Sequence, residues 1–168
     1  DYIGDFQFDI SPNSFFQVNR VQTKILYETA KEYLQCGMED IVFDIYSGIG
    51  TISLFIAKDV KKVIGVESVK AAVENGRINA RNNGVTNSEF YLGKAEEVLP
   101  KLIGINKANK VIVDPPRKGC EIEVIEAIID LAPERIVYVS CNPSTLARDL
   151  KILTKENYEV TKVQPVDM

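Results

Sequence analysis

The sequence is predicted to form an α/β fold with a doubly wound, mostly parallel β-sheet. From residue 41 onward, short apolar runs of strand length alternate with longer segments that carry apolar residues at helical spacing. Strands that alternate with helices in this way imply a parallel sheet that helices cover on both faces. No internal repeat, low-complexity tract or linker interrupts the 168 residues. We therefore expect a single domain over residues 1–168.

Two segments precede the alternating core. Residues 1–18 are expected to form an extended lead-in, because polar and apolar residues alternate over 6–10 and residues 11–13 favour a turn. Residues 19–36 are predicted to form a helix, in which Val21, Ile25 and Tyr33 stand close to helical spacing and which Gly37 ends.

The core is expected over residues 41–168. Strands are predicted at 41–45, 63–67, 89–92, 111–114 and 136–139, with a sixth at 158–166. Helices are predicted at 51–58, 69–83, 96–102, 121–131 and 144–153, and Gly84 ends the second of these. Ligands of such folds bind at the carboxyl ends of the parallel strands, so the residues that follow each strand are the candidates for function.

Composition excludes several classes of protein. A formal net charge of −4 argues against a strongly basic nucleic-acid-binding domain, although Arg117, Lys118 and Arg148 can form a local basic patch. The chain has no histidine, which rules out a Ser-His-Asp hydrolase. Three cysteines without metal-ligand spacing indicate a reducing compartment and no metal. With no membrane-length apolar stretch and no signal-peptide pattern, we expect a cytoplasmic protein.

A nucleotide-type cofactor is predicted at the ends of the first two strands. Asp44 is followed by a turn with Gly48 and Gly50, and glycine lets the backbone approach a ligand closely. Glu67 ends the next strand, about 20 residues further on, where a carboxylate usually accepts hydrogen bonds from ribose hydroxyls. Ser53 breaks the dinucleotide fingerprint at its third glycine, which disfavours a dehydrogenase. A plain glycine turn with a solvated Glu67 is the alternative.

Two further strand ends carry reactive or rigid residues. Pro115 and Pro116 hold Asp114 at the end of the fourth strand. Cys141 follows the fifth strand and precedes a predicted helix, whose unpaired N–H groups favour a thiolate. A thiolate at this edge is well placed to attack a bound substrate. The alternative is a buried cysteine that acts as a small apolar residue.

Five motifs, in this order, resemble those of the S-adenosylmethionine-dependent RNA uracil-5-methyltransferases, which modify uridines in ribosomal or transfer RNA. The resemblance covers nearly the whole chain, and the last two motifs together are highly specific. The motifs span residues 15–19 (FFQVN), 44–51 (DIYSGIGT), 65–67 (GVE), 114–119 (DPPRKG) and 140–143 (SCNP).

The resemblance implies a class I (Rossmann-like) methyltransferase fold and a set of site residues. Cys141 is expected to be the nucleophile, with Asp114 as a second catalytic group at the uracil edge. The residues expected to contact the cofactor or order its pocket are Gln17, Tyr46, Gly48, Gly50, Thr51, Glu67 and Asp114. Phe15 is expected to stack on the target base, and Arg117 and Asn142 to bind the RNA.

The implied reaction transfers a methyl group from S-adenosylmethionine to carbon 5 of a uridine and releases S-adenosylhomocysteine. Ribosomal RNA is favoured over transfer RNA as the substrate. Cys141 would add to carbon 6, because carbon 5 of uracil is too poor a nucleophile to take a methyl group directly. The RNA, with the target base unstacked, is the expected partner, and no stable protein partner is implied.

The chain departs from the family pattern in several places. Ser47 stands where many relatives have cysteine. The final strand, the glutamate expected to act as base beyond Met168, and the N-terminal RNA-binding module are not in the sequence. We therefore expect a catalytic-domain fragment that binds the cofactor, turns over poorly and forms an RNA adduct that does not resolve.

Two other functions remain open. One is methylation of another atom, such as cytosine carbon 5 or a nitrogen. Adenine and amide N-methyltransferases commonly place an aromatic residue where Arg117 stands, and cytosine enzymes commonly carry Pro-Cys, which residues 140–143 do not match. The other is a non-catalytic nucleotide- or RNA-binding module with a buried Cys141.

Overall fold

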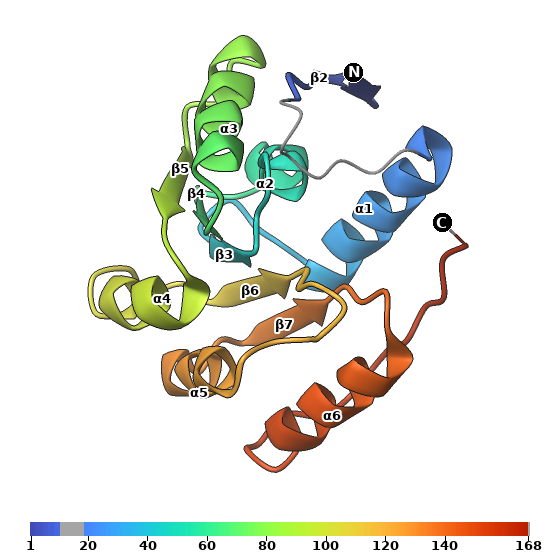
Figure 1. Ribbon diagram of the computed structural model, residues 1–168, viewed down its shortest axis with the longest axis vertical. Helices are drawn as coiled ribbons and strands as arrows, with labels where there is room; N and C mark the ends of the chain where they lie inside the picture. Colours follow the sequence, from blue (N-terminus) through green and yellow to red (C-terminus); the bar gives the residue numbers. More distant parts are fainter. Residues whose placement is uncertain (11–18, 168) are drawn as a thin grey trace.

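A five-stranded parallel sheet forms the centre of the protein (Figure 1). The computed structural model describes residues 1–10 and 19–167. The strand order is β5-β4-β3-β6-β7, and every neighbouring pair is parallel. The strands are β3 (Ile41–Ile45), β4 (Lys62–Glu67), β5 (Ser88–Leu92), β6 (Lys110–Val113) and β7 (Arg135–Tyr138). This order confirms the predicted doubly wound α/β fold.

Helices cover both faces of the sheet (Figure 1). One face carries α1 (Arg20–Leu34), α2 (Thr51–Ala57) and α3 (Lys70–Asn82), and the other carries α4 (Ala95–Ile103), α5 (Ile122–Leu131) and α6 (Pro143–Leu153). Strand residues alternate between the two cores: Val42 packs under α1–α3, and Phe43 packs under α4–α6. A short hairpin, β1 (Tyr2–Ile3) and β2 (Phe6–Gln7), lies before α1 within the predicted lead-in.

The predicted sixth strand at 158–166 is wrong. Residues 158–167 have no strand structure, and no strand among the described residues pairs with the outer edge of β7. A strand requires a hydrogen-bonded neighbour, so its residue types alone cannot form one. The segment instead runs back toward α1 (Figure 1), where Lys162 pairs with Glu32 and lies over the Tyr33 ring.

The first helix ends two residues earlier than predicted. Gln35, rather than Gly37, takes the left-handed conformation after Leu34, with φ of 49°. Its N–H donates to the carbonyls of Lys31 and Glu32, which satisfies the end of the helix. At the start, Asn19 accepts a hydrogen bond from the Gln22 N–H. The turn predicted at residues 11–13 lies outside the described residues.

Three glycines surround the ring of Phe90 in β5. A Cβ atom at Gly50 would lie 2.6 Å from the ring, one at Gly65 2.7 Å, and one at Gly76 3.2 Å. Gly50 and Gly65 belong to the β3–α2 turn and to β4, and Gly76 lies in α3. The ring therefore fills the space between three backbone segments. Its contact with Gly50 helps to fix the position of the glycine turn after β3.

We predict that Gly65→Ala destabilises the protein by about 2 kcal/mol, because the added methyl group has to displace the Phe90 ring in a well-packed core. Urea denaturation gives the free energy of unfolding. Gly104→Ala is the matched control, since its Cβ would meet only the Lys101 carbonyl oxygen at 3.9 Å. In a Phe90→Val background the cost of Gly65→Ala should shrink; equal costs in both backgrounds would contradict the packing argument.

Candidate active site

The functional residues predicted at the strand ends meet at one edge of the sheet. The register pairs Ile45 of β3 with Val66 of β4 and with Val113 of β6, and Val113 with Tyr138 of β7. The residues that follow these strands therefore lie side by side at the carboxyl edge. They include Asp114 and the segment with Cys141; Glu67 is the last residue of β4, and Asp44 lies one residue before the end of β3.

Asp44 is a buried carboxyl with one unpaired oxygen. Its Oδ2 accepts a hydrogen bond of 2.5 Å from Ser53 Oγ, whereas Oδ1 accepts none from the described residues. Ser53, which breaks the dinucleotide fingerprint, thus supports Asp44 from the first turns of α2. This role was not predicted from the sequence. The only indication in the sequence was a small hydroxyl residue in the first turn of the helix that follows the strand with Asp44.

Glu67 holds the glycine turn from the neighbouring strand. Its Oε2 accepts from the Gly48 N–H at 3.0 Å, and its Oε1 accepts from the Val69 N–H at 2.8 Å. A Cβ atom at Gly48 would meet nothing within 4 Å, so the turn faces open space. The predicted acid and turn are therefore directly connected, and open space adjoins the turn at Gly48.

Three other residues predicted for the cofactor pocket make contacts within the protein. Thr51 Oγ1 lies 2.9 Å from the hydroxyl of Tyr27 in α1, a residue that the sequence did not single out. Tyr46 has a positive φ of 66° and packs against the core under α4–α6. Gly50 approaches Phe90. Through these contacts the three residues hold the loop after β3 in place. Gln17 and Phe15 lie outside the described residues.

The site gathers negative charge. Burial raises the pKa of Asp44 to about 7, and repulsion from Asp114 and Glu67 adds to the rise. Burial also raises the pKa of Asp114 to about 6. Without a ligand, the ionisation of these buried carboxyls costs free energy. A cationic ligand lowers that cost, so the site favours a ligand with positive charge.

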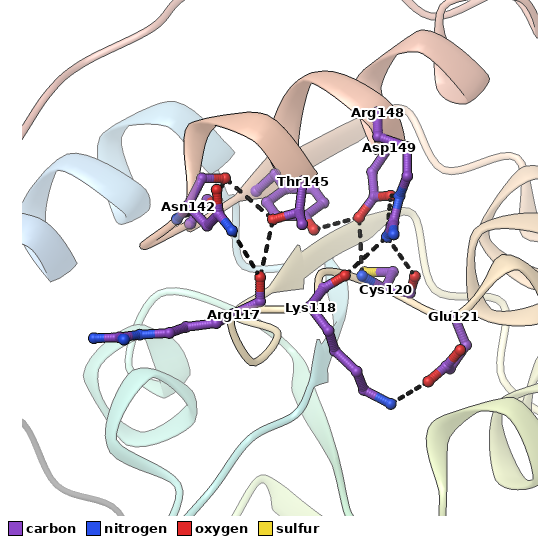
Figure 2. Close-up of polar contacts among 10 residues, drawn as sticks. Arg117, Lys118, Cys120, Glu121, Asn142, Thr145, Arg148 and Asp149 are labelled. Carbon is purple, nitrogen blue, oxygen red and sulfur yellow. Dashed lines mark hydrogen bonds and ion pairs between the residues drawn. The ribbon is translucent and has the colours of Figure 1, made fainter.

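Cys141 is exposed, in contrast to the other two cysteines. Cys120 is buried and Cys36 half-buried, and burial raises the pKa of each of these thiols to about 11. Asn142 caps α6 through a hydrogen bond from the Ser144 N–H at 3.0 Å. Its Nδ2 also donates to the Arg117 carbonyl at 3.1 Å, while the Arg117 guanidinium extends away from α6 (Figure 2). Cys141 is thus held beside the turn that begins at Asp114.

The described residues contain no cluster of three His, Cys, Asp or Glu side chains suited to a metal. Nor does any helix in residues 1–10 and 19–167 have the length and apolar character required to cross a membrane.

We predict that the protein loses stability as pH rises from about 4 to about 7. The folded state raises the pKa of Asp44 from 3.8 to about 7, so it holds a proton that the unfolded chain has already released. The loss for this group is at most about 4 kcal/mol. Urea denaturation at several pH values measures it. Asp114, whose pKa burial raises to about 6, adds a loss that ends near pH 6, so Asp44→Asn should flatten the slope between about pH 6 and 7 and leave part of it below. Glu126→Gln on the exposed face of α5 should leave the whole slope; an unchanged slope in Asp44→Asn would contradict the assignment.

The chain resembles known RNA methyltransferases along nearly its whole length. The family model for tRNA (uracil-5-)-methyltransferase matches residues 4–167. An uncharacterized RNA methyltransferase of Caldanaerobacter subterraneus is 58% identical over 170 residues, and one of Clostridium tetani is 55% identical. Each alignment covers 100% of this chain, and the chain spans 37% of the length of each relative.

Solved structures agree with the fold. The tRNA (uracil-54, C5)-methyltransferase of Pyrococcus abyssi, in complex with S-adenosyl-L-homocysteine, is 36% identical with a TM-score of 0.78, over 90% of this chain and 36% of that one. The precorrin 8W decarboxylase of Methanobacterium thermoautotrophicum, 21% identical with a TM-score of 0.73 over 90% of this chain and 79% of that one, shares the fold alone. With a family model that matches nearly every residue and a class I methyltransferase fold, this chain belongs to the tRNA (uracil-5-)-methyltransferase family.

Proposed function

We propose that this chain carries the catalytic site of an S-adenosylmethionine-dependent enzyme that methylates carbon 5 of uridine in RNA. The observation that carries the proposal is the placement of an exposed thiol, Cys141, beside the Asp114 turn on adjacent strand ends. The glycine turn and Glu67 stand at the same edge, on β3 and β4. Nucleophile and cofactor groups therefore face one region.

The residues present fit S-adenosylmethionine. The buried Asp44 Oδ1 accepts no hydrogen bond from the described residues, so it is available to a donor such as the ammonium of the cofactor. Glu67 would accept from the ribose hydroxyls, and the space above Gly48 admits a ligand. The raised pKa values of Asp44 and Asp114 suit a cofactor with a positive sulfonium and ammonium. When bound, S-adenosylmethionine supplies an electrophilic methyl group.

Cys141 makes carbon 5 reactive. Its thiolate forms a C–S bond at carbon 6 of uracil, and the electron pair of the 5,6 double bond moves onto carbon 5 and oxygen 4. Asp114 adjoins this position; as a carboxylate it accepts from the ring N–H, and as an acid it donates to oxygen 4. After carbon 5 has gained the methyl group, a base removes its proton, and the C–S bond breaks to return the thiolate.

The substrate is proposed to be either ribosomal RNA or transfer RNA. Ribosomal RNA is the substrate expected from the sequence, whereas the solved relative from Pyrococcus abyssi is a tRNA (uracil-54, C5)-methyltransferase. Methylation assays on ribosomal RNA fragments and on unmodified tRNA, run side by side, distinguish the two substrates. Arg117, whose guanidinium is exposed beside the site, is proposed to contact a phosphate of either RNA.

We predict that Cys141 forms a covalent adduct with RNA that contains 5-fluorouridine. Fluorine at carbon 5 cannot leave as a proton, so the adduct persists after methyl transfer. A denaturing gel then shows a protein–RNA band that requires S-adenosylmethionine. Cys141→Ala should abolish the band, and Cys36→Ala should retain it. An adduct in Cys141→Ala would show that another nucleophile acts, and no adduct with a wild-type chain that binds the cofactor would refute uridine carbon 5 as the target.

We also predict that Glu67→Ala weakens the binding of S-adenosylhomocysteine by about 10- to 100-fold, the effect of losing hydrogen bonds to a charged group. Isothermal titration measures the affinity, and Glu67→Gln, which keeps one acceptor oxygen, should fall between wild type and Glu67→Ala. Glu89→Gln on β5 is the control, because Glu89 pairs with Lys62 away from the glycine turn. Equal affinities in wild type and Glu67→Ala would remove Glu67 from the cofactor site.

A further inference from the structure

α6 is fastened to the loop that follows the Asp114 turn, residues 117–120, by side-chain hydrogen bonds to its backbone (Figure 2). Asn142 Nδ2 and Thr145 Oγ1 donate to the Arg117 carbonyl at 3.1 and 3.3 Å. Arg148 Nη2 donates to the carbonyls of Lys118 and Cys120, each at 3.0 Å. Thr145 and Arg148 lie in α6, and Asn142 caps its start. Cys141 comes immediately before this cap.

Asp149 is the centre of this contact. Its carboxylate is completely buried. Oδ2 accepts from the Cys120 N–H at 2.9 Å and from the Tyr138 hydroxyl at 2.6 Å, and Oδ1 accepts from Arg148 Nε at 2.8 Å. The carboxylate thus joins three segments: the loop after β6, the end of β7 and α6. A buried carboxylate is tolerated only where donors satisfy it in this way.

Gly119 allows the loop 117–120 to approach α6 closely. Its φ is +80°, and a Cβ atom there would lie 2.6 Å from both Asp149 Oδ2 and Arg148 Nη2. Only glycine leaves room for the two charged groups against the backbone. The glycine of the fourth motif is therefore explained by its contact with α6.

We propose that Arg148 and Asp149 are positioning residues for the methyl-transfer reaction: they fix Cys141 relative to Asp114 and do not touch the substrate. The proposal rests on the proposed function. Cys141 stands two residues before α6, and Asp114 stands three residues before the loop 117–120. Because α6 and this loop are hydrogen-bonded to each other, short segments connect the two groups. Attack on carbon 6 requires reactive atoms in a near-attack geometry, and a misplacement of about 1 Å can cost about 100-fold in rate.

The test measures the rate of adduct formation with 5-fluorouridine RNA in Asp149→Asn, normalised to the number of S-adenosylhomocysteine-binding sites from titration. Asn keeps the shape of the side chain but loses one acceptor for its buried donors. We expect the maximal rate per site to fall by about 10- to 100-fold at saturating RNA, with the affinity for S-adenosylhomocysteine retained, because Glu67 and the glycine turn lie on other strands.

Arg148→Lys is the second variant, since it keeps the charge and loses the two-carbonyl contact; a smaller fall in the same maximal rate is expected. Glu121→Gln is the control, because Glu121 follows this loop, pairs with Lys118 at the protein surface and makes no hydrogen bond or salt bridge with α6 in the described part of the chain. Its rate should equal that of wild type.

Each outcome decides a separate point. Wild-type rates per site in both Asp149→Asn and Arg148→Lys would overturn the positioning role and leave the proposed function intact. A fall that only tracks the loss of binding sites would show a purely structural role and overturn the proposal equally. No adduct with the wild-type chain would refute the proposed function, and the positioning role with it.

Discussion

The parallel pairing of β3 with β4 on one side and β6 on the other is the constraint on which the site depends. Parallel strands point their carboxyl ends the same way, so one register brings the glycine turn, Glu67 and Asp114 to a single edge. β7 then adds the segment with Cys141 beside β6. A shift of register by one residue would turn Asp44 toward the opposite core and separate it from Ser53.

Two buried carboxyls in this protein, Asp44 and Asp149, differ in how their oxygens are satisfied. Among the described residues Asp44 lacks a donor for one oxygen, and burial raises its pKa to about 7, so its charge is poorly compensated in the protein alone. Asp149 is equally buried, yet its donors come from three segments, which is the condition of a group that holds structure together. The number and origin of the donors support the different roles proposed for the two groups: ligand binding for Asp44 and a structural contact for Asp149.

The sequence predicted the sheet strands of the core closely, because their apolar runs and the glycines that follow carry local information. It was wrong about residues 158–166, since a strand depends on a partner that composition does not reveal. It also placed the end of α1 at Gly37, although Gln35 adopts the left-handed conformation. The roles of Tyr27 and Asp149 were missed because each acts through a contact between segments far apart in the sequence: 24 positions separate Tyr27 from Thr51, and 29 separate Cys120 from Asp149. Ser53 lies only nine positions from Asp44, but its hydrogen bond depends on how α2 packs back on β3.

The packing of Phe90 against three glycines has a consequence for how such sequences diverge. A larger residue at position 50, 65 or 76 is accommodated only if the ring at position 90 becomes smaller, so these four positions are expected to change together over evolution. None of them needs to take part in the chemistry of the site. Covariation among them therefore provides a signature of the scaffold that does not depend on which residue stands at position 141.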